Sequence, residues 1–215
     1  MKSDTFAKKE EDCMKIFALY LPQYHEIAEN DEWWGKGFTE WVNVKKAIPL
    51  YKGHLQPKHP MNENYYNLMD KKTVKWQTYI MHKYGLSGMI YYHYYFNGHL
   101  LLEKPAENLL KWTDIEQPFF FCWANHTWNR AWRGTKEVLQ EQTYGEEEDW
   151  EKHFQYLLPF FMDRRYEKID NKPVFMLYDC SIKEKDAMFA AFDKWCRNAG
   201  FSGIHIIEEC FGIEN

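Results

Sequence analysis

The sequence lacks several patterns that mark large classes of proteins. Its basic residues are scattered, with no cluster longer than pairs such as Lys71-Lys72 and Arg164-Arg165, and the formal net charge is −5. Nucleic-acid binding needs clustered Lys and Arg, so we expect no nucleic-acid partner. The glycine-rich turn of dinucleotide-binding sheets, the P-loop and any Asp-x-Asp pair are absent as well. We therefore expect neither a cofactor nor a metal site.

Long apolar runs are also missing. No apolar stretch approaches the roughly 20 residues that a membrane span needs, and residues 1–14 form a polar tail without an apolar signal core. The cysteines form no Cys-x-x-Cys pair, and three of them fall in apolar strand-like or helix-like runs, so we expect buried free thiols. These features predict a cytoplasmic protein without a membrane span. The cysteines are Cys13, Cys122, Cys180, Cys196 and Cys210.

Aromatic side chains are present in excess, at 19% of the residues. Many of them stand beside Asn, Gln, His and Glu in segments without helical periodicity. Sugar rings present apolar C–H faces surrounded by hydroxyl groups, so aromatic faces next to polar side chains suit carbohydrate. Aromatic rings also bury large areas in protein cores. Composition alone leaves both interpretations open.

Strand-like and helix-like stretches alternate along the chain. Such alternation implies parallel strands joined by crossover helices. Because no glycine-rich turn follows the first strand, a (β/α)8 barrel is favoured over a doubly wound sheet. The strand-like runs, rich in β-branched and aromatic residues, are 15–21, 88–96, 118–124, 137–141, 173–178 and 203–207. The helix-like stretches are 70–84, 105–112, 149–162 and 182–199.

The number of strands does not complete such a barrel. A (β/α)8 barrel has eight βα units and typically about 250 residues, whereas about six units fit in this chain. We expect residues 15–215 to form one barrel domain that lacks about two units at its C-terminus. Exposed strand edges invite pairing, so a second copy or a partner is expected to cover the open edge.

The loops after barrel strands form the binding face of such folds. Residues 22–69 are a long segment with little periodicity, and loops of this length are usually functional or disordered. A surface histidine at position 25, or a tryptophan pair that caps the core, explains parts of these loops equally well. The candidate sugar-binding residues are Gln23, Tyr24, His25, Trp34, Glu40, Trp41, Asn97, Trp123, Asn125, His126, Trp128, Trp132, Tyr144 and Tyr178.

A carboxylate ends the fourth predicted strand. Glu141 precedes the next helix, so the helix dipole does not account for it, whereas it accounts for the acidic run 146–149. A carboxylate at a barrel mouth near aromatic rings is a typical general acid or base for glycosidic bonds. Most such mechanisms need a second carboxylate, for which Glu146 is the nearest candidate. Others at strand ends or in the long loop are Glu40, Asp179, Glu208 and Glu209.

Five stretches together resemble a known family. They read ALYLPQYHEIAENDEWWGKGFTEWVNVKKA, YYHYYFNGHLLLEKP, FCWANHTWNRAW, EVLQEQTYGEEEDWEKHF and NKPVFMLYD. They are similar to the glycoside hydrolase family 99-like domain, also called the WbsX-type glycosyltransferase family. The resemblance implies a (β/α)8 barrel that acts in the assembly or processing of bacterial surface polysaccharide, such as O-antigen or capsule. Family 99 proper contains retaining endo-acting α-mannan enzymes with two glutamates after the fourth strand, a place that Glu141 holds here.

Three functions remain open on the sequence. The first is carboxylate-catalysed cleavage or transfer of a glycosidic bond, with Glu141 and Glu146 as catalytic residues. The second is a nucleotide-sugar-dependent glycosyltransferase, although the chain has no Asp-x-Asp pair. The third is a non-catalytic glycan-binding or scaffold domain. In each case the expected partner is a glycan or oligosaccharide.

Overall fold

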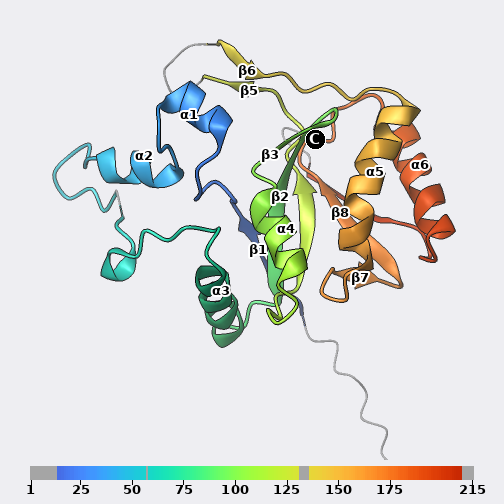
Figure 1. Cartoon of the computed structure of the whole chain (residues 1–215), viewed down its shortest axis with the longest axis horizontal. Helices are drawn as coiled ribbons and strands as arrows, with labels where there is room; N and C mark the ends of the chain where they lie inside the picture. The colour runs from blue at the N-terminus through green and yellow to red at the C-terminus, as the bar shows by residue number, and fades with distance from the viewer. Residues whose placement is uncertain (1–13, 57, 131–135, 210–215) are drawn as a thin grey trace, which may run out of the picture.

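The structure is a computed structural model that describes residues 14–56, 58–130 and 136–209 (Figure 1). At its centre, five parallel strands lie side by side in chain order. They are β1 (Phe17–Tyr20), β2 (Gly88–Phe96), β4 (Phe119–Trp123), β8 (Lys172–Leu177) and β9 (His205–Glu208). Two short strands, β3 (His99–Leu101) and β7 (Lys168–Ile169), pair antiparallel with β2 and β8. The predicted α/β fold with a mostly parallel sheet is confirmed.

Helices connect the parallel strands as the periodicity predicts. Asp70 caps the first of them, because its side chain accepts a hydrogen bond of 2.9 Å from the Lys72 N–H. The helix ends differ from the predicted ones by at most three residues. The four helices are α3 (Lys71–Lys83), α4 (Lys104–Lys111), α5 (Glu147–Met162) and α6 (Lys185–Asn198).

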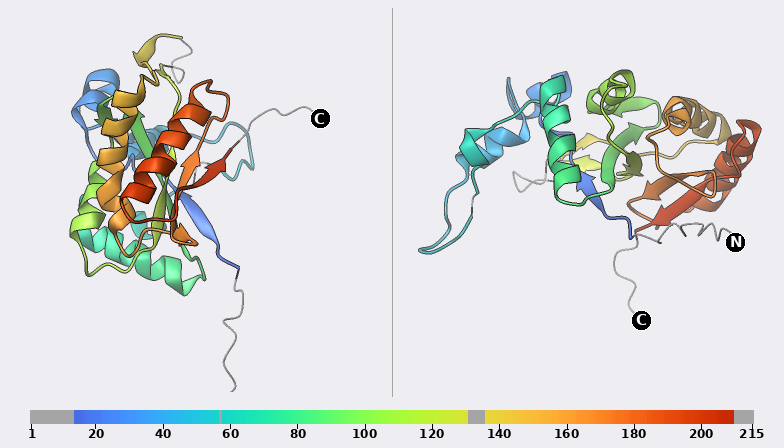
Figure 2. Two further views of the ribbon diagram at one scale, coloured as in Figure 1. Left: turned by 90° about the vertical axis from the view of Figure 1, so that its right-hand side faces the viewer. Right: turned by 90° about the horizontal axis from the view of Figure 1, so that it is seen from below.

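These four helices all pack on one face of the sheet and form an arc outside the strands (Figure 2). Side chains alternate between the two faces of a strand, and Phe121 and Phe175 point to the helices. The ring of Phe121 lies 4.9 Å from that of Phe160 in α5, and Phe175 lies 6.1 Å from Phe192 in α6. A doubly wound sheet carries helices on both faces. The described part of this chain is wound on one side only.

The opposite face of the sheet carries no helix within the described ranges. Leu19 on this face is 52% exposed, and Ile90, Tyr92 and Met176 are partly exposed. No pairing between β1 and β9 closes the sheet in the described residues. The (β/α)8 barrel, complete or incomplete, therefore stays a prediction.

One predicted strand lies outside the parallel sheet. Residues 137–141 contribute β6 (Val138–Gln140), which pairs antiparallel with β5 (Trp128–Asn129) in a separate two-stranded sheet. The prediction of a fourth parallel strand is wrong. A three-residue strand pairs here with a segment close in sequence, for which loop closure costs less entropy than a long crossover. Glu141 consequently follows a hairpin.

The long segment after β1 contains more regular structure than its sequence indicates. It forms two short helices, α1 (Ala28–Trp34) and α2 (Glu40–Lys46), and a 3-10 turn, Met61–Glu63. Each helix has only seven residues. Such short helices show too few turns for a clear periodic pattern, which explains why the sequence does not reveal them.

The cysteines are only partly as expected. Cys122 and Cys196 are buried free thiols, and burial raises the pKa of each to about 12. Cys180 is disulfide-bonded, so the expectation of free thiols is wrong there, and the cysteines no longer indicate a reducing compartment. Cys13 and Cys210 lie outside the described residues. Among the helices described, none has the length and apolar character of a membrane span.

Candidate functional site

A hollow of about 400 Å³ lies at the C-terminal ends of β1, β2 and β4. Its walls come from the loop after β1, from α1, from the end of β2 and from the β5–β6 hairpin. The lining combines aromatic faces with amide, imidazole and hydroxyl groups. It consists of Gln23, Trp34, Tyr94, His126, Thr127, Trp128, Asn129 and Leu139.

The structure thus brings together four of the predicted sugar-binding residues, namely Gln23, Trp34, His126 and Trp128. The other four lining residues are outside the set of candidate sugar-binding residues, although Asn129 belongs to the aromatic and polar stretch after the third predicted strand that suits a sugar subsite. Tyr94 lies within a strand-like run, where the sequence does not tell which face a residue takes. Thr127 and Asn129 stand between predicted site residues, so their place in the same loop was the available signal.

Packing holds the aromatic walls in place. The Trp128 ring meets Tyr94 and Trp33 edge-on, at centroid distances of 4.9 and 6.0 Å. The Arg130 guanidinium lies 5.3 Å from the centre of the Trp34 ring and pairs with Glu137 at 2.8 Å. These contacts join α1 to the β5–β6 hairpin. The hollow is therefore a preformed feature with stacking faces already oriented.

Gln23 links the hollow to the start of α2. It is 8% exposed, and its carbonyl accepts a hydrogen bond of 3.1 Å from the Glu40 N–H. Burial raises the pKa of the Glu40 carboxyl above its usual value. Burial also raises the pKa of Tyr24, and the Glu40 charge adds to that effect. Glu40 is thus a partly buried carboxylate beside the hollow, although it does not line it.

Tyr24 and Trp41 lie in an aromatic cluster next to the hollow. Their ring centroids are 4.5 Å apart, and Trp41 also meets Tyr66 at 4.9 Å. The Trp41 Nε1–H donates to the Tyr66 carbonyl at 2.7 Å. The cluster joins the loop after β1 to the segment before α3. Its rings are used in packing, and their sugar-binding role stays a prediction.

His25 is buried rather than on the surface. It is 2% exposed, and neither ring nitrogen has a hydrogen-bond partner among the described residues. Burial lowers the pKa of its imidazole. The side-chain amide of Asn30 in α1 is likewise buried without a described partner, and the sequence did not indicate it. Neither residue lines the hollow.

Asn125 ties the loop after β4 to the loop after β8. Its Nδ2 donates to the Asp179 carbonyl at 2.9 Å, and its Oδ1 accepts from the Asp179 N–H at 2.8 Å. The Tyr144 hydroxyl donates to the Asn125 carbonyl at 2.9 Å. Both polar atoms of the fully buried Asn125 side chain are therefore engaged with backbone. This arrangement indicates that Asn125 positions the loops of the site.

Replacing Asn125 with alanine is expected to lower the free energy of unfolding by about 2 kcal/mol, because it leaves partly buried backbone groups of Asp179 unpaired. Urea unfolding followed by tryptophan fluorescence measures this loss. Asn129→Ala is the matched control, since Asn129 is exposed at the rim of the hollow. Equal stability of the two variants would show that the hydrogen bonds between Asn125 and the Asp179 backbone do not stabilise the fold.

Aromatic and acidic groups meet at the ends of β8 and β9. The Tyr178 ring lies 5.3 Å from His126 and 6.1 Å from Tyr92. The Oε2 atom of Glu209, which follows β9, is buried without a hydrogen-bond partner among the described residues. Burial raises the pKa of Tyr92, and the charges of Cys122, Tyr178 and Glu209 add to it. Glu209 therefore shares the uncovered face of the sheet with these rings.

The two predicted catalytic glutamates lie elsewhere. Glu141 and Glu146 are both exposed, and neither lines the hollow. Glu146 begins α5 in a capping box, in which its N–H donates to the Asp149 carboxylate at 3.2 Å. Helix capping accounts for Glu146 at this position. The catalytic role of either residue stays a prediction.

Two further candidates, Trp123 and Asn97, are also outside the hollow. Trp123 is 2% exposed on the helix-facing side, where its Nε1–H donates to the Tyr95 carbonyl at 3.0 Å. Its place in the core does not support sugar stacking. Asn97, with φ 45°, and Gly98 form the tight turn between β2 and β3. Trp132 lies outside the described residues.

Comparison of the sequence with known proteins identifies its family. Residues 16–212 match the family described as Glycosyltransferase WbsX. Two curated relatives, each an uncharacterized protein WxcX from a strain of Xanthomonas campestris pv. campestris, are 35% identical over 193 residues. The match covers 89% of this chain, which spans only 28% of each relative's length.

One solved structure is also similar, a glycoside hydrolase family 99 endo-α-mannosidase from Bacteroides thetaiotaomicron. It shares 12% sequence identity, with a TM-score of 0.44, over 76% of this chain and 44% of that chain. The family match, by contrast, extends over nearly all of the sequence. The chain belongs to the WbsX glycosyltransferase family, a family 99-like group.

Proposed function

We propose that this chain forms the glycan-binding site of an enzyme that cleaves or transfers a glycosidic bond in bacterial surface polysaccharide of the O-antigen or capsule type. The hollow carries this proposal, because Trp34, Tyr94 and Trp128 line it together with the amides of Gln23 and Asn129. Its volume of about 400 Å³ is in the range of small-ligand sites. Membership of the WbsX family supports a glycan as the ligand.

We further propose that the parallel sheet is an arc of a (β/α)8 barrel. The support is its sequential strand order, its single layer of helices and its uncovered second face. Active sites of such barrels lie at the C-terminal ends of the strands, which is where the hollow lies. Further βα units, a second copy or a partner would cover β1 and β9, the two ends of the arc.

Two partly buried acids at this end of the sheet extend the choice of catalytic carboxylates. One carboxylate oxygen of Glu209 is buried and has no hydrogen-bond partner within the described ranges, and Glu40 lies beside Gln23. Because Glu40 and Glu209 are partly shielded from solvent, both are more suitable for acid–base catalysis than the exposed Glu141 and Glu146. Glu208→Gln is a matched control for Glu209→Gln, because Glu208 pairs with Lys185 on the helix-facing side. Loss of turnover in Glu209→Gln but not in Glu208→Gln would support a catalytic role for Glu209. Unchanged turnover in Glu209→Gln would exclude that role.

Replacing Trp128 with alanine is expected to weaken oligosaccharide binding by roughly 30-fold, about 2 kcal/mol, as for a buried aromatic anchor at a binding site. Calorimetry with oligosaccharides selected on an array of O-antigen and capsule fragments measures the change. Trp76→Ala is the control, since Trp76 is 42% exposed on α3, outside the hollow. Unchanged binding by Trp128→Ala, or no binding by the unmodified chain, would overturn the glycan site.

The description of the family favours a second candidate within the same class, a glycosyltransferase that uses a nucleotide sugar. Titration of the chain with UDP- and GDP-linked sugars distinguishes the two. Tight binding of a nucleotide sugar in competition with the oligosaccharide would support the transferase. Binding of the oligosaccharide alone would support action on an existing glycosidic bond.

A further inference from the structure

A projecting segment, residues 45–56, runs from the last turn of α2 towards the 3-10 turn; it has an unusual surface and is called the arm below. Figure 1 shows it extending away from the sheet and the helices, on the side of α2. Four large apolar side chains in it are highly exposed. They are Ile48 at 73%, Leu50 at 81%, Tyr51 at 66% and Leu55 at 86%.

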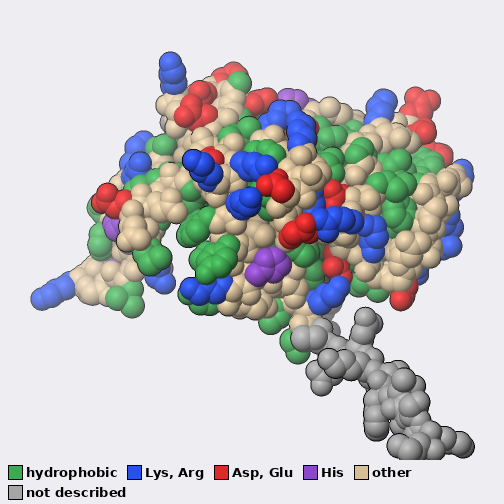
Figure 3. Space-filling view, turned by 60° about the horizontal axis from the view of Figure 1, so that its bottom comes forward, with side chains coloured by type: hydrophobic (Ala, Val, Ile, Leu, Met, Phe, Trp, Pro, Cys, Tyr) green, Lys and Arg blue, Asp and Glu red, His purple; other side chains and the backbone are tan. Residues whose placement is uncertain are grey.

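The arm is also basic. Its lysines are Lys45, Lys46 and Lys52, and the surrounding sequence from residue 41 to residue 62 contains no Asp or Glu, although the whole chain carries a net charge of −5. The space-filling view shows blue and green side chains together at the end of this projection (Figure 3). The arm therefore concentrates positive charge and apolar surface on an otherwise acidic protein.

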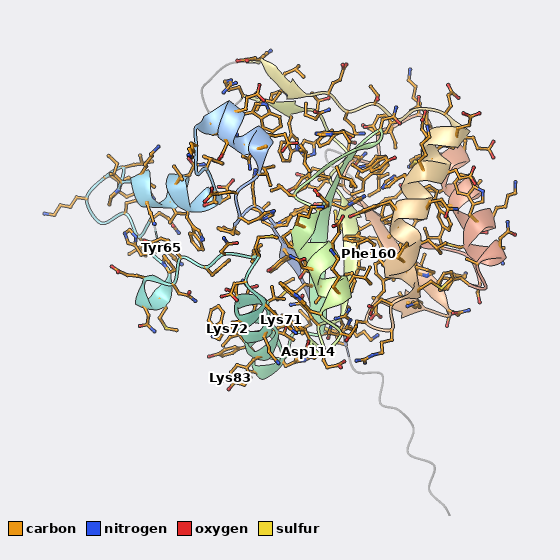
Figure 4. The ribbon with its side chains drawn as sticks, viewed as in Figure 1. Tyr65, Lys71, Lys72, Lys83, Asp114 and Phe160 are labelled. Atoms are coloured by element: carbon orange, nitrogen blue, oxygen red, sulfur yellow. The ribbon has the colours of Figure 1, made fainter. Side chains whose placement is uncertain are left out.

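Local contacts define the shape of the arm. At its tip, the Leu50 N–H donates to His54 Nδ1 at 3.1 Å, and the Tyr51 ring stacks on His54 at 4.7 Å. At its base, the Lys45 ammonium lies 4.2 Å from the centre of the Tyr65 ring (Figure 4). These contacts hold the tip in a turn while Leu50 and Leu55 remain in solvent.

A binding partner for the arm has to be both anionic and apolar. Nucleic acid supplies phosphates but offers the aliphatic side chains no comparable apolar phase. The headgroup region of an anionic bilayer supplies both within a few ångströms, because lysines contact lipid phosphates while apolar and aromatic side chains enter the boundary of the acyl chains. Charge complementarity together with the apolar tip therefore favours a lipid surface.

We propose that the arm is an interfacial anchor that holds the protein on an anionic phospholipid surface. Leu50, Tyr51 and Leu55 enter the headgroup region, and Lys46 and Lys52 contact phosphates. This attachment is peripheral, because it uses a short arm and no spanning helix. It does not depend on the glycan site, since none of its residues lines the hollow.

Flotation of the full chain with vesicles tests the anchor. We expect the chain to float with phosphatidylcholine vesicles that contain phosphatidylglycerol, to stay in solution with pure phosphatidylcholine, and to be released by high salt. Leu50→Ser with Leu55→Ser, and separately Lys46→Gln with Lys52→Gln, are each expected to reduce partitioning roughly tenfold. Circular dichroism of each variant checks that the fold is kept.

The control removes the same charge elsewhere. Lys72 and Lys83 lie on α3, away from the arm (Figure 4), and Lys72→Gln with Lys83→Gln is expected to leave flotation unchanged. An equal loss in this control would show general electrostatic attraction and overturn the anchor. So would absence of flotation by the unmodified chain. An arm variant that changes the mass of the particle in light scattering, without changing flotation, would assign the arm to contact with a second copy.

Discussion

Replacing Arg165 with methionine is expected to lower the free energy of unfolding by about 3–5 kcal/mol, the usual cost of removing one partner from a buried charged pair. Arg165 is 6% exposed and follows α5. Its Nε and Nη2 atoms donate to the Asp163 carboxylate at 2.9 and 2.7 Å. Loss of the guanidinium would leave this carboxylate partly buried without its cation.

The same guanidinium also caps the C-terminal end of α4. Nη2 donates to the Leu109 carbonyl at 2.8 Å, and Nη1 donates to the carbonyls of Trp112 and Ile115 at 3.0 and 2.8 Å. The last carbonyls of a helix have no partner within the helix. Arg165 supplies one for α4 and joins it to the segment after α5. A methionine fills similar volume but donates to none of these oxygens.

Urea unfolding of Arg165→Met, followed by tryptophan fluorescence, measures this effect. The neighbouring Arg164→Met is the matched control. Arg164 is exposed and pairs with Glu116 at the surface, and such pairs contribute little, so its stability is expected to stay close to that of the unmodified chain. Comparable losses in both variants would show that the carbonyl contacts of Arg165 are not important.

Mild acid is expected to destabilise the protein through two buried histidines. The Nε2 atoms of His93 in β2 and His153 in α5 lie 2.8 Å apart, and His153 stacks on Tyr95 at 3.9 Å. Burial lowers the pKa of His93 to about 3. Burial also lowers the pKa of His153, and repulsion from His93 adds to that effect. Both imidazoles are therefore neutral in the folded protein.

The direction of the pH dependence follows from these lowered pKa values. In the unfolded chain each histidine takes up a proton below a pKa of about 6.5, whereas the folded pair does not. Stability is therefore fully present above that pH and is lost as the pH falls towards the folded pKa of His93, about 3. In this window each histidine lowers the free energy of unfolding by about 1.4 kcal/mol for every unit by which the pH falls. Between about pH 7 and about pH 5 the pair is therefore expected to lower the free energy of unfolding by about 4 kcal/mol.

The double variant His93→Phe with His153→Leu isolates this effect. It replaces both polar partners with apolar groups, so no unpaired donor remains, and the part of the acid slope due to the pair should disappear. Urea unfolding at a series of pH values measures the slope. His82→Gln is the control, because His82 is exposed on α3 and lies outside the buried pair. A double variant that keeps the original slope would show that the pair does not govern acid stability.

Much of the fold follows from local sequence patterns. The run 88–96 is rich in apolar and aromatic residues because most side chains of β2 are buried, and it predicts the strand to the residue. Asp70 marks the start of α3 because its carboxylate caps the first turn. Glu141 shows the limit of such patterns. A three-residue strand carries no information about its partner, so the sequence could not tell a hairpin from a parallel strand.

Position relative to a strand was sufficient to predict that some residues lie together at one end of the sheet. Gln23 and His126 follow β1 and β4, and parallel strands bring such residues to one end of the sheet, so both line the hollow. The prediction that Trp123 lies at the binding face did not hold, because successive side chains of a strand lie on opposite faces and Trp123 lies on the helix-facing side. Asn125 was found, but its engagement with the Asp179 backbone was not, since that contact joins residues 54 positions apart.

The sequence by itself determined the α/β class, which follows from short-range periodicity, and the family, which follows from the resemblance of five long stretches. Only the tertiary structure decided which side chains meet at the candidate site. It joined Trp34 and Trp128 across a hollow, placed Glu146 in a helix cap, and paired His93 with His153 over 60 residues. The physical reason is that these contacts arise from strand register and helix packing, which depend on the summed burial of distant segments and on no local motif.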